Sequence, residues 1–319
     1  MNQPSLSLRS FAKINWRLEI LGKRPDGYHE VETLLQTISL HDDLHFEVSE
    51  DNTVTISCDD SDIPTDKHNL VVRAAHALQT RCQVEKGARI RLEKRIPTKA
   101  GLGGASSNCA VALLALVYLW DIKPTAVELF EIAAKLGADV PFFLLGGCVR
   151  ASGTGTTLSP LPAEAEPTLQ HLIVITPNVG VSTATAYAAL NSRALTTKNT
   201  NPILSVSQSE ANASDSQPWP RKDSLKNDFE SVIFDIEPEI RRTKETLLQA
   251  GALGALLAGS GSSVFGMFAN REDQQRAVNE IKLEAGWRIF PCDTVSRAEY
   301  LRRSGAWDIP FLRSFNFGI

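Results

Sequence analysis

The sequence predicts an α+β protein of two domains. Its 319 residues are enough for two hydrophobic cores. Segments that alternate between apolar and polar residues, as strands do, are interleaved with segments of helical periodicity in both halves. A polar segment rich in Ser, Asn, Thr and Pro interrupts the second half at residues 196–224. We expect one domain over residues 1–168 and a second over residues 169–319, with residues 196–224 as a surface excursion.

The first half mixes strands and helices. Strand-like alternation covers residues 7–21, 43–49, 53–57 and 88–96. Residues 69–82 predict a helix with a polar start, and residues 124–137 predict one with Pro in its first turn and Gly at its end. The first domain should therefore contain several antiparallel strands with helices between them.

The second half continues the mixture without an internal repeat. Buried strands are expected over residues 171–177 and 262–268. The helices expected here cover residues 182–190, 238–250 and 271–285. The apolar C-terminal segment, residues 307–319, should pack on its own domain or serve a self-association contact.

Charge and composition favour a small-molecule partner. The net charge is -4, and no block of Lys or Arg is dense enough to bind the phosphates of a nucleic acid. The five cysteines are scattered and never spaced C-x-x-C, which indicates buried thiols rather than disulfides or a zinc site. No membrane span or secretory signal pattern occurs. We expect a cytoplasmic monomer or weak homodimer with no nucleic acid or membrane partner.

The stretch "PTKAGLGGASSN", residues 97–108, leads into an apolar helical pattern. A Gly-rich turn that opens a helix gathers unpaired backbone N–H groups and the positive end of the helix dipole, and it lets a polyphosphate approach closely. Glycines alone would indicate only a tight turn, but Ser106, Ser107 and Asn108 add groups that contact phosphate or metal. The stretch therefore predicts an anion-binding loop. It lacks the P-loop, dinucleotide-binding and protein-kinase patterns.

This loop resembles the second signature motif of the superfamily of galactokinase, homoserine kinase, mevalonate kinase and phosphomevalonate kinase. The stretches "AKINWRLEILGKRPDGYHEVET" and "LLAGSGSSVFGMF" resemble its other motifs, in the same order. Ala105, Cys109 and Trp16 depart from the residues usual in the family. The resemblance implies an N-terminal ribosomal-protein-S5-like domain and a C-terminal ferredoxin-like α/β-sandwich domain, with the active site in the cleft between them.

The same resemblance implies an ATP-dependent small-molecule kinase, a phosphotransferase with an alcohol acceptor, that uses Mg²⁺. "P-D-G-Y-H-E", "L-G-A-D-V-P-F-F" and "N-D-F-E" are similar to one branch of the superfamily. That branch phosphorylates the 2-hydroxyl of a cytidine diphosphate-linked methylerythritol in the non-mevalonate route to isopentenyl diphosphate and dimethylallyl diphosphate. Two alternatives stay open: a mevalonate-type or homoserine-type kinase, which "D-G-Y-H" disfavours, and a non-catalytic anion- or RNA-binding protein, which the missing basic stripe disfavours.

The resemblance also implies roles for single residues. Lys13 and Asp139 are the catalytic pair: Asp139 accepts the hydroxyl proton, and Lys13 stabilises the carboxylate and the developing charge. Without the resemblance, Asp139 would be a turn residue and Lys13 part of a solvated strand face. Tyr28 and His29, just past the turn "P-D-G", would recognise cytosine by stacking and by its polar edge; otherwise they are a half-buried aromatic and a surface imidazole.

The remaining expected site residues fall into three groups. The residues expected to bind ATP are Pro97, Gly101, Leu102, Gly103, Gly104, Ala105, Ser106, Ser107 and Asn108. The residues expected to bind the acceptor are Asn15, Tyr28, His29, Asp139, Thr183 and Gly261. The residue expected to contact Mg²⁺ is Ser107.

Overall fold

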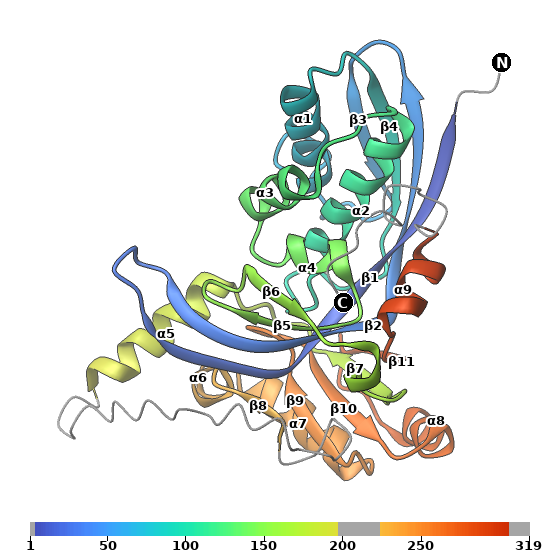
Figure 1. Cartoon of the computed structure of the whole chain (residues 1–319). Coiled ribbons are helices and arrows are strands. Elements are labelled where there is room, and N and C mark those ends of the chain that lie inside the picture. Colours follow the sequence, from blue (N-terminus) through green and yellow to red (C-terminus); the bar gives the residue numbers. More distant parts are fainter. Residues whose placement is uncertain (1–3, 197–223, 306–319) are drawn as a thin grey trace.

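The computed structural model describes residues 4–196 and 224–305, without the side chains of residues 192–196 (Figure 1). Two β-sheets, each with helices packed against it, make up these residues, so the predicted α+β class is confirmed. Almost all of the polar excursion predicted at residues 196–224, and the whole apolar segment 307–319, lie outside the described residues.

The first sheet is built on a long antiparallel hairpin of β1 and β2. β4 pairs with the outer half of β2, and β3 pairs in parallel with β4. The short strand β8, which comes from the second half of the chain, pairs in parallel with β1. β5 and β6 branch from β2. The strands are β1 (Ser5–Lys23), β2 (His29–Ser49), β3 (Val54–Cys58), β4 (Gly87–Glu93), β5 (Cys148–Ser152), β6 (Thr157–Pro160) and β8 (Lys226–Asn227).

Strand β2 is longer than the sequence predicts, because it begins at His29 and not at residue 43. The missed part contains Leu34, Leu35 and Ile38, which are all buried. Leu35 belongs to the core under the helices, whereas Leu34 and Ile38 belong to the core shared with the second sheet. A strand that is buried on both faces does not alternate, and periodicity therefore misses it.

Helices α1 to α4 accompany the first sheet. Helix α2 is buried at 13 of its 16 residues and packs on β1, α1 and α4. Asn69 caps α1 as its polar start predicts. Thr125 caps α3 with a capping box, so Pro124 precedes the helix and is not in its first turn. The helices are α1 (Leu70–Cys82), α2 (Gly104–Leu119), α3 (Ala126–Leu136) and α4 (Val140–Leu145).

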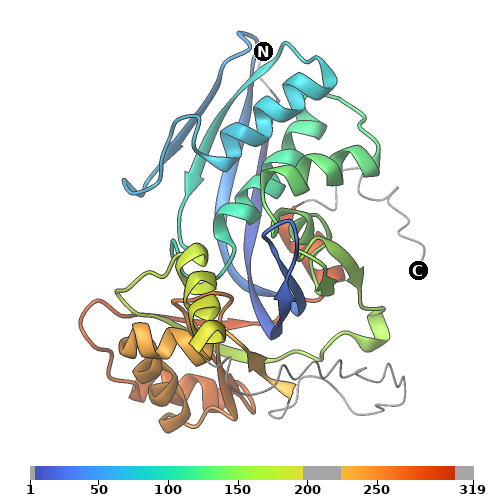
Figure 2. The same ribbon diagram turned by 90° about the vertical axis from the view of Figure 1, so that its left-hand side faces the viewer.

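The second sheet is antiparallel, in the order β11-β7-β10-β9. Its strands succeed one another as β-α-β-β-α-β, which is the ferredoxin-like arrangement expected. Helices α7 and α8 cover one face (Figure 2). Helix α8 ends at Glu280, five residues before the predicted end at 285. The elements are β7 (His171–Thr176), α5 (Thr183–Thr196), α6 (Glu230–Ile236), α7 (Pro238–Gln249), β9 (Gly254–Leu257), β10 (Val264–Phe268), α8 (Arg271–Glu280) and β11 (Arg288–Asp293).

The two sheets share a hydrophobic core. Trp16 on β1 is fully buried and meets the ring of Phe265 on β10 edge-on, with the centroids 5.4 Å apart. Helix α9 (Arg297–Ser304) then returns to the first sheet beside β1 and β2 (Figure 1). Its Tyr300 is buried against Phe11 and donates a hydrogen bond to the Phe143 carbonyl on α4. Both ends of the described chain are therefore joined to one sheet.

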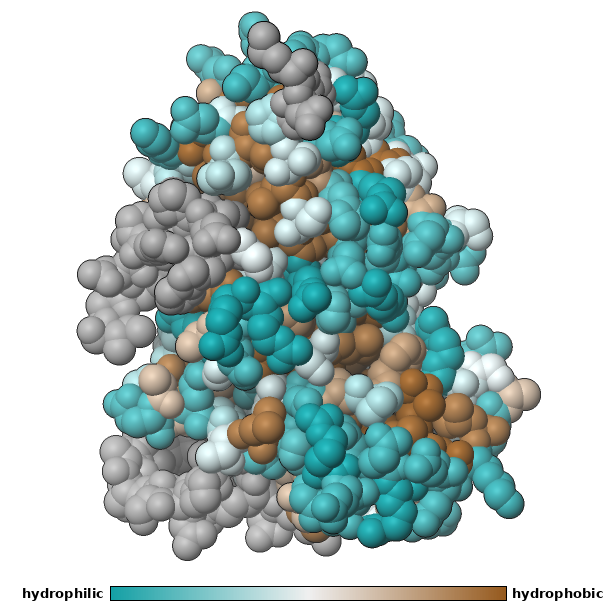
Figure 3. Space-filling view, turned by 90° about the vertical axis from the view of Figure 1, so that its right-hand side faces the viewer, coloured by the Kyte–Doolittle hydropathy of each residue, from teal (hydrophilic) through white to brown (hydrophobic). Residues whose placement is uncertain are grey.

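Polar and charged residues cover most of the face drawn in Figure 3, and apolar residues gather there in separate patches. Among the described residues, no helix combines the length and the apolar character that crossing a membrane requires.

Candidate active site

A cavity of about 1200 Å³ lies where loops from the two sheets meet. The glycine loop, the start of β2 and the turn before α4 line it from the first sheet, and the loops after β7 and β9 line it from the second. The expected site residues that line it are Lys13, Asn15, Tyr28, His29, Pro97, Gly101, Leu102, Gly103, Gly104, Ala105, Ser106, Asn108, Asp139, Thr183 and Gly261.

The glycine loop can have no side chains at two of its positions. Gly101 and Gly103 have φ of +77° and +71°, which is the left-handed region. A Cβ on Gly101 would lie 1.9 Å from the Ala258 carbonyl oxygen of the second sheet, and one on Gly103 would lie 2.8 Å from the Phe143 ring. Gly103 is the N-cap of α2, and no side chain caps that helix. The first N–H groups of α2 are thus available to an anion.

The polar residues of the loop take different positions. Ser106 and Asn108 line the cavity, whereas Ser107 is fully buried and accepts a hydrogen bond from the Ser10 hydroxyl at 2.7 Å. The Mg²⁺ contact expected of Ser107 stays a prediction, and Ser106 is the loop serine that faces the cavity. Ala105 lies in the first turn of α2 without a positive φ, so its Cβ causes no strain there.

Lys13 and Asp139, far apart in the sequence, meet at the cavity. Lys13 is only 4% exposed, and its Nζ lies 3.8 Å from Asp139 Oδ2. The same ammonium donates to Asn15 Oδ1 at 2.9 Å, and Asn15 Nδ2 donates to Thr33 Oγ1 at 2.7 Å. A buried ammonium requires such partners. Asp139 is the N-cap residue of α4 but makes no capping hydrogen bond, so its carboxylate remains available.

The second glycine-rich loop, "G-S-G-S-S" at residues 259–263, packs on the first. Ser263 N donates to the Ala100 carbonyl at 3.1 Å, which joins the two loops directly. Asn227 Nδ2 donates to the Leu257 and Gly259 carbonyls and so fixes the loop from β8. Thr183 Oγ1 lies 3.1 Å from Ser260 Oγ, at the start of α5.

At one end of the cavity, His29 is flanked by residues that the sequence did not single out. Its ring stacks on Tyr187 of α5, with the centroids 4.4 Å apart, and its Nε2 lies 3.0 Å from Asn191 Oδ1. Burial, and then the charge of Asp139, raise the pKa of Tyr187. Tyr28, at the turn before β2, is 67% exposed and lines the same end. Tyr187 lies inside the predicted helix 182–190, but periodicity alone gives it no role.

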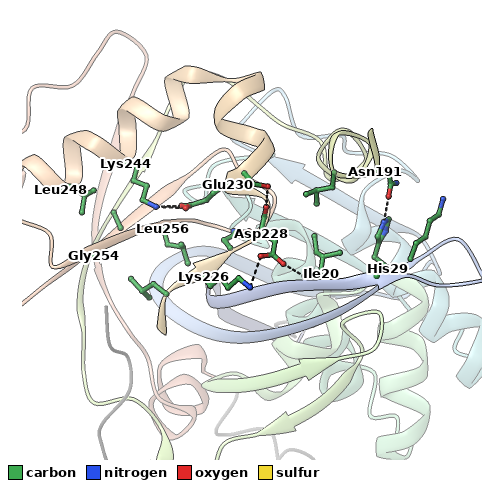
Figure 4. A pocket seen from close by; sticks show the side chains of 17 residues that line it. Ile20, His29, Asn191, Lys226, Asp228, Glu230, Lys244, Leu248, Gly254 and Leu256 are labelled. Atoms are coloured by element: carbon green, nitrogen blue, oxygen red, sulfur yellow. Dashed lines mark hydrogen bonds and ion pairs between the residues drawn. The ribbon is translucent and has the colours of Figure 1, made fainter. Parts of the chain in front are cut away.

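Figure 4 shows the residues that line a second cavity, of about 740 Å³, among them His29 and Asn191. These two residues line both cavities, and a hydrogen bond joins them. The lysines of the second cavity that carry ion pairs are Lys226, with Asp228 at 3.4 Å, and Lys244, with Glu230 at 2.7 Å.

The opposite end of the main cavity also contains residues that the sequence did not predict. Ile63, Pro64 and Asn69 line it beside the glycine loop. Lys94 lies under the first turn of α2, and its ammonium pairs with the fully buried Asp42 at 2.9 Å. No short motif contains these residues, because they come from three separate segments.

Comparisons with known proteins agree with this geometry. Residues 69–147 match the family model of the GHMP kinases N-terminal domain, and residues 211–285 match that of the GHMP kinases C-terminal domain. A solved structure of 16% identity, the L. major mevalonate kinase in complex with R-mevalonate, has a TM-score of 0.66 over 92% of this chain and 97% of that chain, which shows the shared fold.

Relatives of higher sequence identity indicate the branch of the GHMP kinases to which the chain belongs. The chain is 40% identical over 289 residues to the 4-diphosphocytidyl-2-C-methyl-D-erythritol kinase of Chlorobium luteolum, covering 90% of this chain and 97% of that protein. It is 42% identical over 268 residues to the enzyme of that name from Pelotomaculum thermopropionicum, covering 83% and 90%. A crystal structure of 4-(cytidine 5'-diphospho)-2C-methyl-D-erythritol kinase is 33% identical, with a TM-score of 0.71 over 91% of this chain and 99% of that chain. The chain therefore belongs to the 4-diphosphocytidyl-2-C-methyl-D-erythritol kinase family, within the ATP-dependent GHMP kinases.

Proposed function

We propose that this protein transfers the γ-phosphate of ATP to the 2-hydroxyl of 4-diphosphocytidyl-2-C-methyl-D-erythritol. The observation that carries the proposal is the Lys13–Asp139 pair, which faces the cavity between an uncapped helix N-terminus and the aromatic end at His29. Donor, acceptor and a candidate base can then occupy one cleft. The product is the 2-phosphate of the acceptor, with ADP, as in the non-mevalonate route to isopentenyl and dimethylallyl diphosphate.

The reaction needs alignment and charge stabilisation more than covalent help. The acceptor hydroxyl oxygen bonds to the γ-phosphorus, the bond from that phosphorus to the bridging β-phosphate oxygen breaks, and the hydroxyl proton passes to Asp139. The backbone N–H groups of Gly103, Gly104 and Ser106 would hold phosphate oxygens. The Lys13 ammonium, held by Asn15, stabilises the negative charge that develops on the transferred group.

We include Mg²⁺ as a partner of the nucleotide. Among the described residues, no group of three or more His, Cys, Asp or Glu could hold a metal by itself. Mg²⁺ in kinases is bound through phosphates and one or two protein oxygens, so the oxygen donors of the cleft fit it. Ser106, which faces the cavity, and Ser107, as the sequence suggests, are the candidate ligands. The ion supplies neutralisation of the β- and γ-phosphate charge.

The acceptor's cytosine fits the end of the cavity that holds His29. Stacked rings at His29 and Tyr187, together with the exposed ring of Tyr28, offer flat apolar faces to a base. Base–aromatic stacking contributes about 1 to 3 kcal/mol per base. The imidazole and the polar groups near it can satisfy the edge of the base, and an unpaired edge penalises a wrong base more than a lost stack does. Asn15 and Thr183 are candidate contacts for the rest of the acceptor.

Product analysis tests the proposal. The purified protein, ATP and Mg²⁺ are incubated with the cytidine acceptor, mevalonate or homoserine, and products are identified by mass and phosphorus NMR. We expect phosphorylation of the cytidine acceptor at its 2-hydroxyl. Efficient phosphorylation of mevalonate or homoserine with the cytidine acceptor untouched would overturn it.

We propose further that the two domains meet near residues 168 and 169, since β7, the first strand of the second sheet, begins at His171.

The five cysteines are all free thiols, which supports a reducing compartment such as the cytoplasm. Among the described residues, the large exposed apolar side chains come from different elements, for example Leu21 on β1 and Val127 on α3, which supports a monomer or weak homodimer.

A further inference from the structure

Lys99 has a backbone conformation that lysine rarely adopts. It follows Thr98 near the start of the loop of residues 97–108, before its first glycine, and its φ is +52°, in the left-handed region. Glycine takes such a turn position at no steric cost, whereas a Cβ there approaches the following carbonyl oxygen. A residue other than glycine at a strained position next to a binding site calls for a functional reason.

The side chain of Lys99 starts where the loops of the two sheets face each other. Its Cβ lies 3.7 Å from the position that a Cβ on Gly180 would occupy, in the loop between β7 and α5. Val181 and Ser182, which follow Gly180, line the same cavity as Lys99 and Gly101. Lys99 is therefore at the entrance to the glycine loop and is exposed to whatever ligand fills the cleft.

The ammonium of Lys99 differs from those of the other lysines of the cavity in its interactions with the protein. Lys13 is paired with Asp139, and Lys94 is paired with the buried Asp42. The Lys99 ammonium, by contrast, has no hydrogen bond or ion pair with any side chain or backbone group that the structure describes. A positive charge without a protein partner, beside open backbone N–H groups, suits a polyanion.

We propose that Lys99 binds phosphate oxygens of a ligand in the cleft, in addition to the backbone groups of the glycine loop. This inference rests on the proposed function, because it takes the ligands to be ATP and a cytidine diphosphate ester. Both carry a diphosphate, and Lys99 lies between the glycine loop and the loop that leads to Thr183. The strain at φ +52° and the absence of a partner for this ammonium among the described residues then have one explanation: the charge is kept at a cost in stability.

Three variants separate the charge from the strain. Lys99→Gly removes both, Lys99→Met keeps the Cβ and the length but removes the charge, and Lys99→Arg keeps the charge. The dissociation constants of ADP and of CDP are measured by calorimetry at low and high salt, with thermal unfolding of each variant. We expect Lys99→Gly and Lys99→Met to bind ADP or CDP about tenfold more weakly at low salt, with the loss reduced at high salt. Lys99→Arg should bind like the unaltered protein.

Thermal unfolding gives an independent signature. Lys99→Gly should melt at a higher temperature than the unaltered protein, because the left-handed position no longer carries a Cβ, while Lys99→Met should melt at the same temperature. A loss confined to ADP assigns Lys99 to the nucleotide, and a loss confined to CDP assigns it to the acceptor.

Unchanged affinity for both ligands in Lys99→Met overturns the proposal, as does a lower melting temperature of Lys99→Gly. Weaker binding by Lys99→Gly alone would attribute the effect to loop flexibility and also overturns it. These binding measurements need no turnover. If the protein fails to phosphorylate the cytidine acceptor, the proposed function fails while the role of Lys99 is still decided.

Discussion

The Asp139 carboxylate, 3.8 Å from the ammonium of Lys13, is the group on which turnover should depend most. Asp139→Asn keeps the size of the side chain but removes the negative charge that would accept the hydroxyl proton in the proposed reaction. We expect kcat to fall by about two orders of magnitude or more, with the ATP dissociation constant nearly unchanged. Steady-state kinetics and calorimetry measure the two quantities. A variant with full kcat would exclude Asp139 from the reaction.

His29 and Asn191 should act as a pair. The contact between His29 Nε2 and Asn191 Oδ1, 3.0 Å long, fixes the ring beside the cavity. His29→Ala should raise KM for the cytidine acceptor strongly and leave KM for ATP nearly unchanged. Asn191→Ala should raise the acceptor KM less. In the double variant the Asn191 change should have little further effect on the acceptor KM, because Asn191 acts through the His29 ring.

A double variant in which the two effects simply add would show that Asn191 acts independently of His29. Tyr28→Ala serves as the matched comparison, since Tyr28 is 67% exposed at the same end and offers only its ring. It should raise the acceptor KM more mildly. If either His29→Ala or Tyr28→Ala raises KM for ATP and leaves KM for the acceptor unchanged, the two ends of the cleft have been assigned in reverse.

Helix α9 supports α4, the helix that begins next to the candidate base Asp139. Tyr300 donates to the carbonyl of Phe143 on α4, and the Phe143 ring lies against Gly103 of the glycine loop. Tyr300→Phe removes one buried hydrogen bond and should destabilise the protein by about 1 kcal/mol. We also expect kcat to fall while KM for ATP changes little, because Asp139 at the other end of α4 is less well fixed.

Urea unfolding and steady-state kinetics check this prediction. Tyr118→Phe is a suitable control, since Tyr118 is about half exposed on α2 and lies away from the cavity residues. A Tyr300→Phe protein that loses stability but keeps its full kcat would limit the role of α9 to stability.

Most elements could be predicted from the sequence because they are amphipathic or capped. Asn69 marks the start of α1, and β4 alternates between buried and exposed residues from Ala88 to Leu92. The inner half of β2 could not be predicted, since Leu34 and Leu35 are buried on opposite faces. The Lys13–Asp139 pair came from a family resemblance, because no local pattern brings strand β1 to the start of α4. Tyr187, Asn191 and Lys94 needed the structure, since only tertiary packing brings them to the cavity.

For the whole molecule, buried thiols set the response to alkaline pH. Burial raises the pKa of Cys109 to about 12 and also raises those of Cys148 and Cys292. A free thiol in the unfolded chain has a pKa near 9.0. The unfolded state therefore releases protons first, and stability present below pH 9.0 is lost as the pH rises toward the folded value.

We expect the free energy of unfolding, measured by urea titration, to fall steadily above about pH 9, by up to about 1.4 kcal/mol per pH unit for each thiol. The stability of the Cys109→Ala variant should fall less steeply with pH, because one titrating group is gone. Cys58→Ala is the control, since Cys58 is only partly buried and should alter the slope less. Equal slopes for Cys109→Ala and the unaltered protein would contradict this account.

The return of α9 to the first sheet has a consequence for synthesis on the ribosome. Phe11 is made long before its partner Tyr300, and Thr37 is made long before Val295, whose N–H donates a hydrogen bond to the Thr37 carbonyl. Domains normally fold in order as they are made. Here the apolar cluster around Phe11 stays incomplete until α9 has been made. A nascent chain stalled before α9 should therefore leave an apolar surface for chaperones, and synthesis of α9 should cover it.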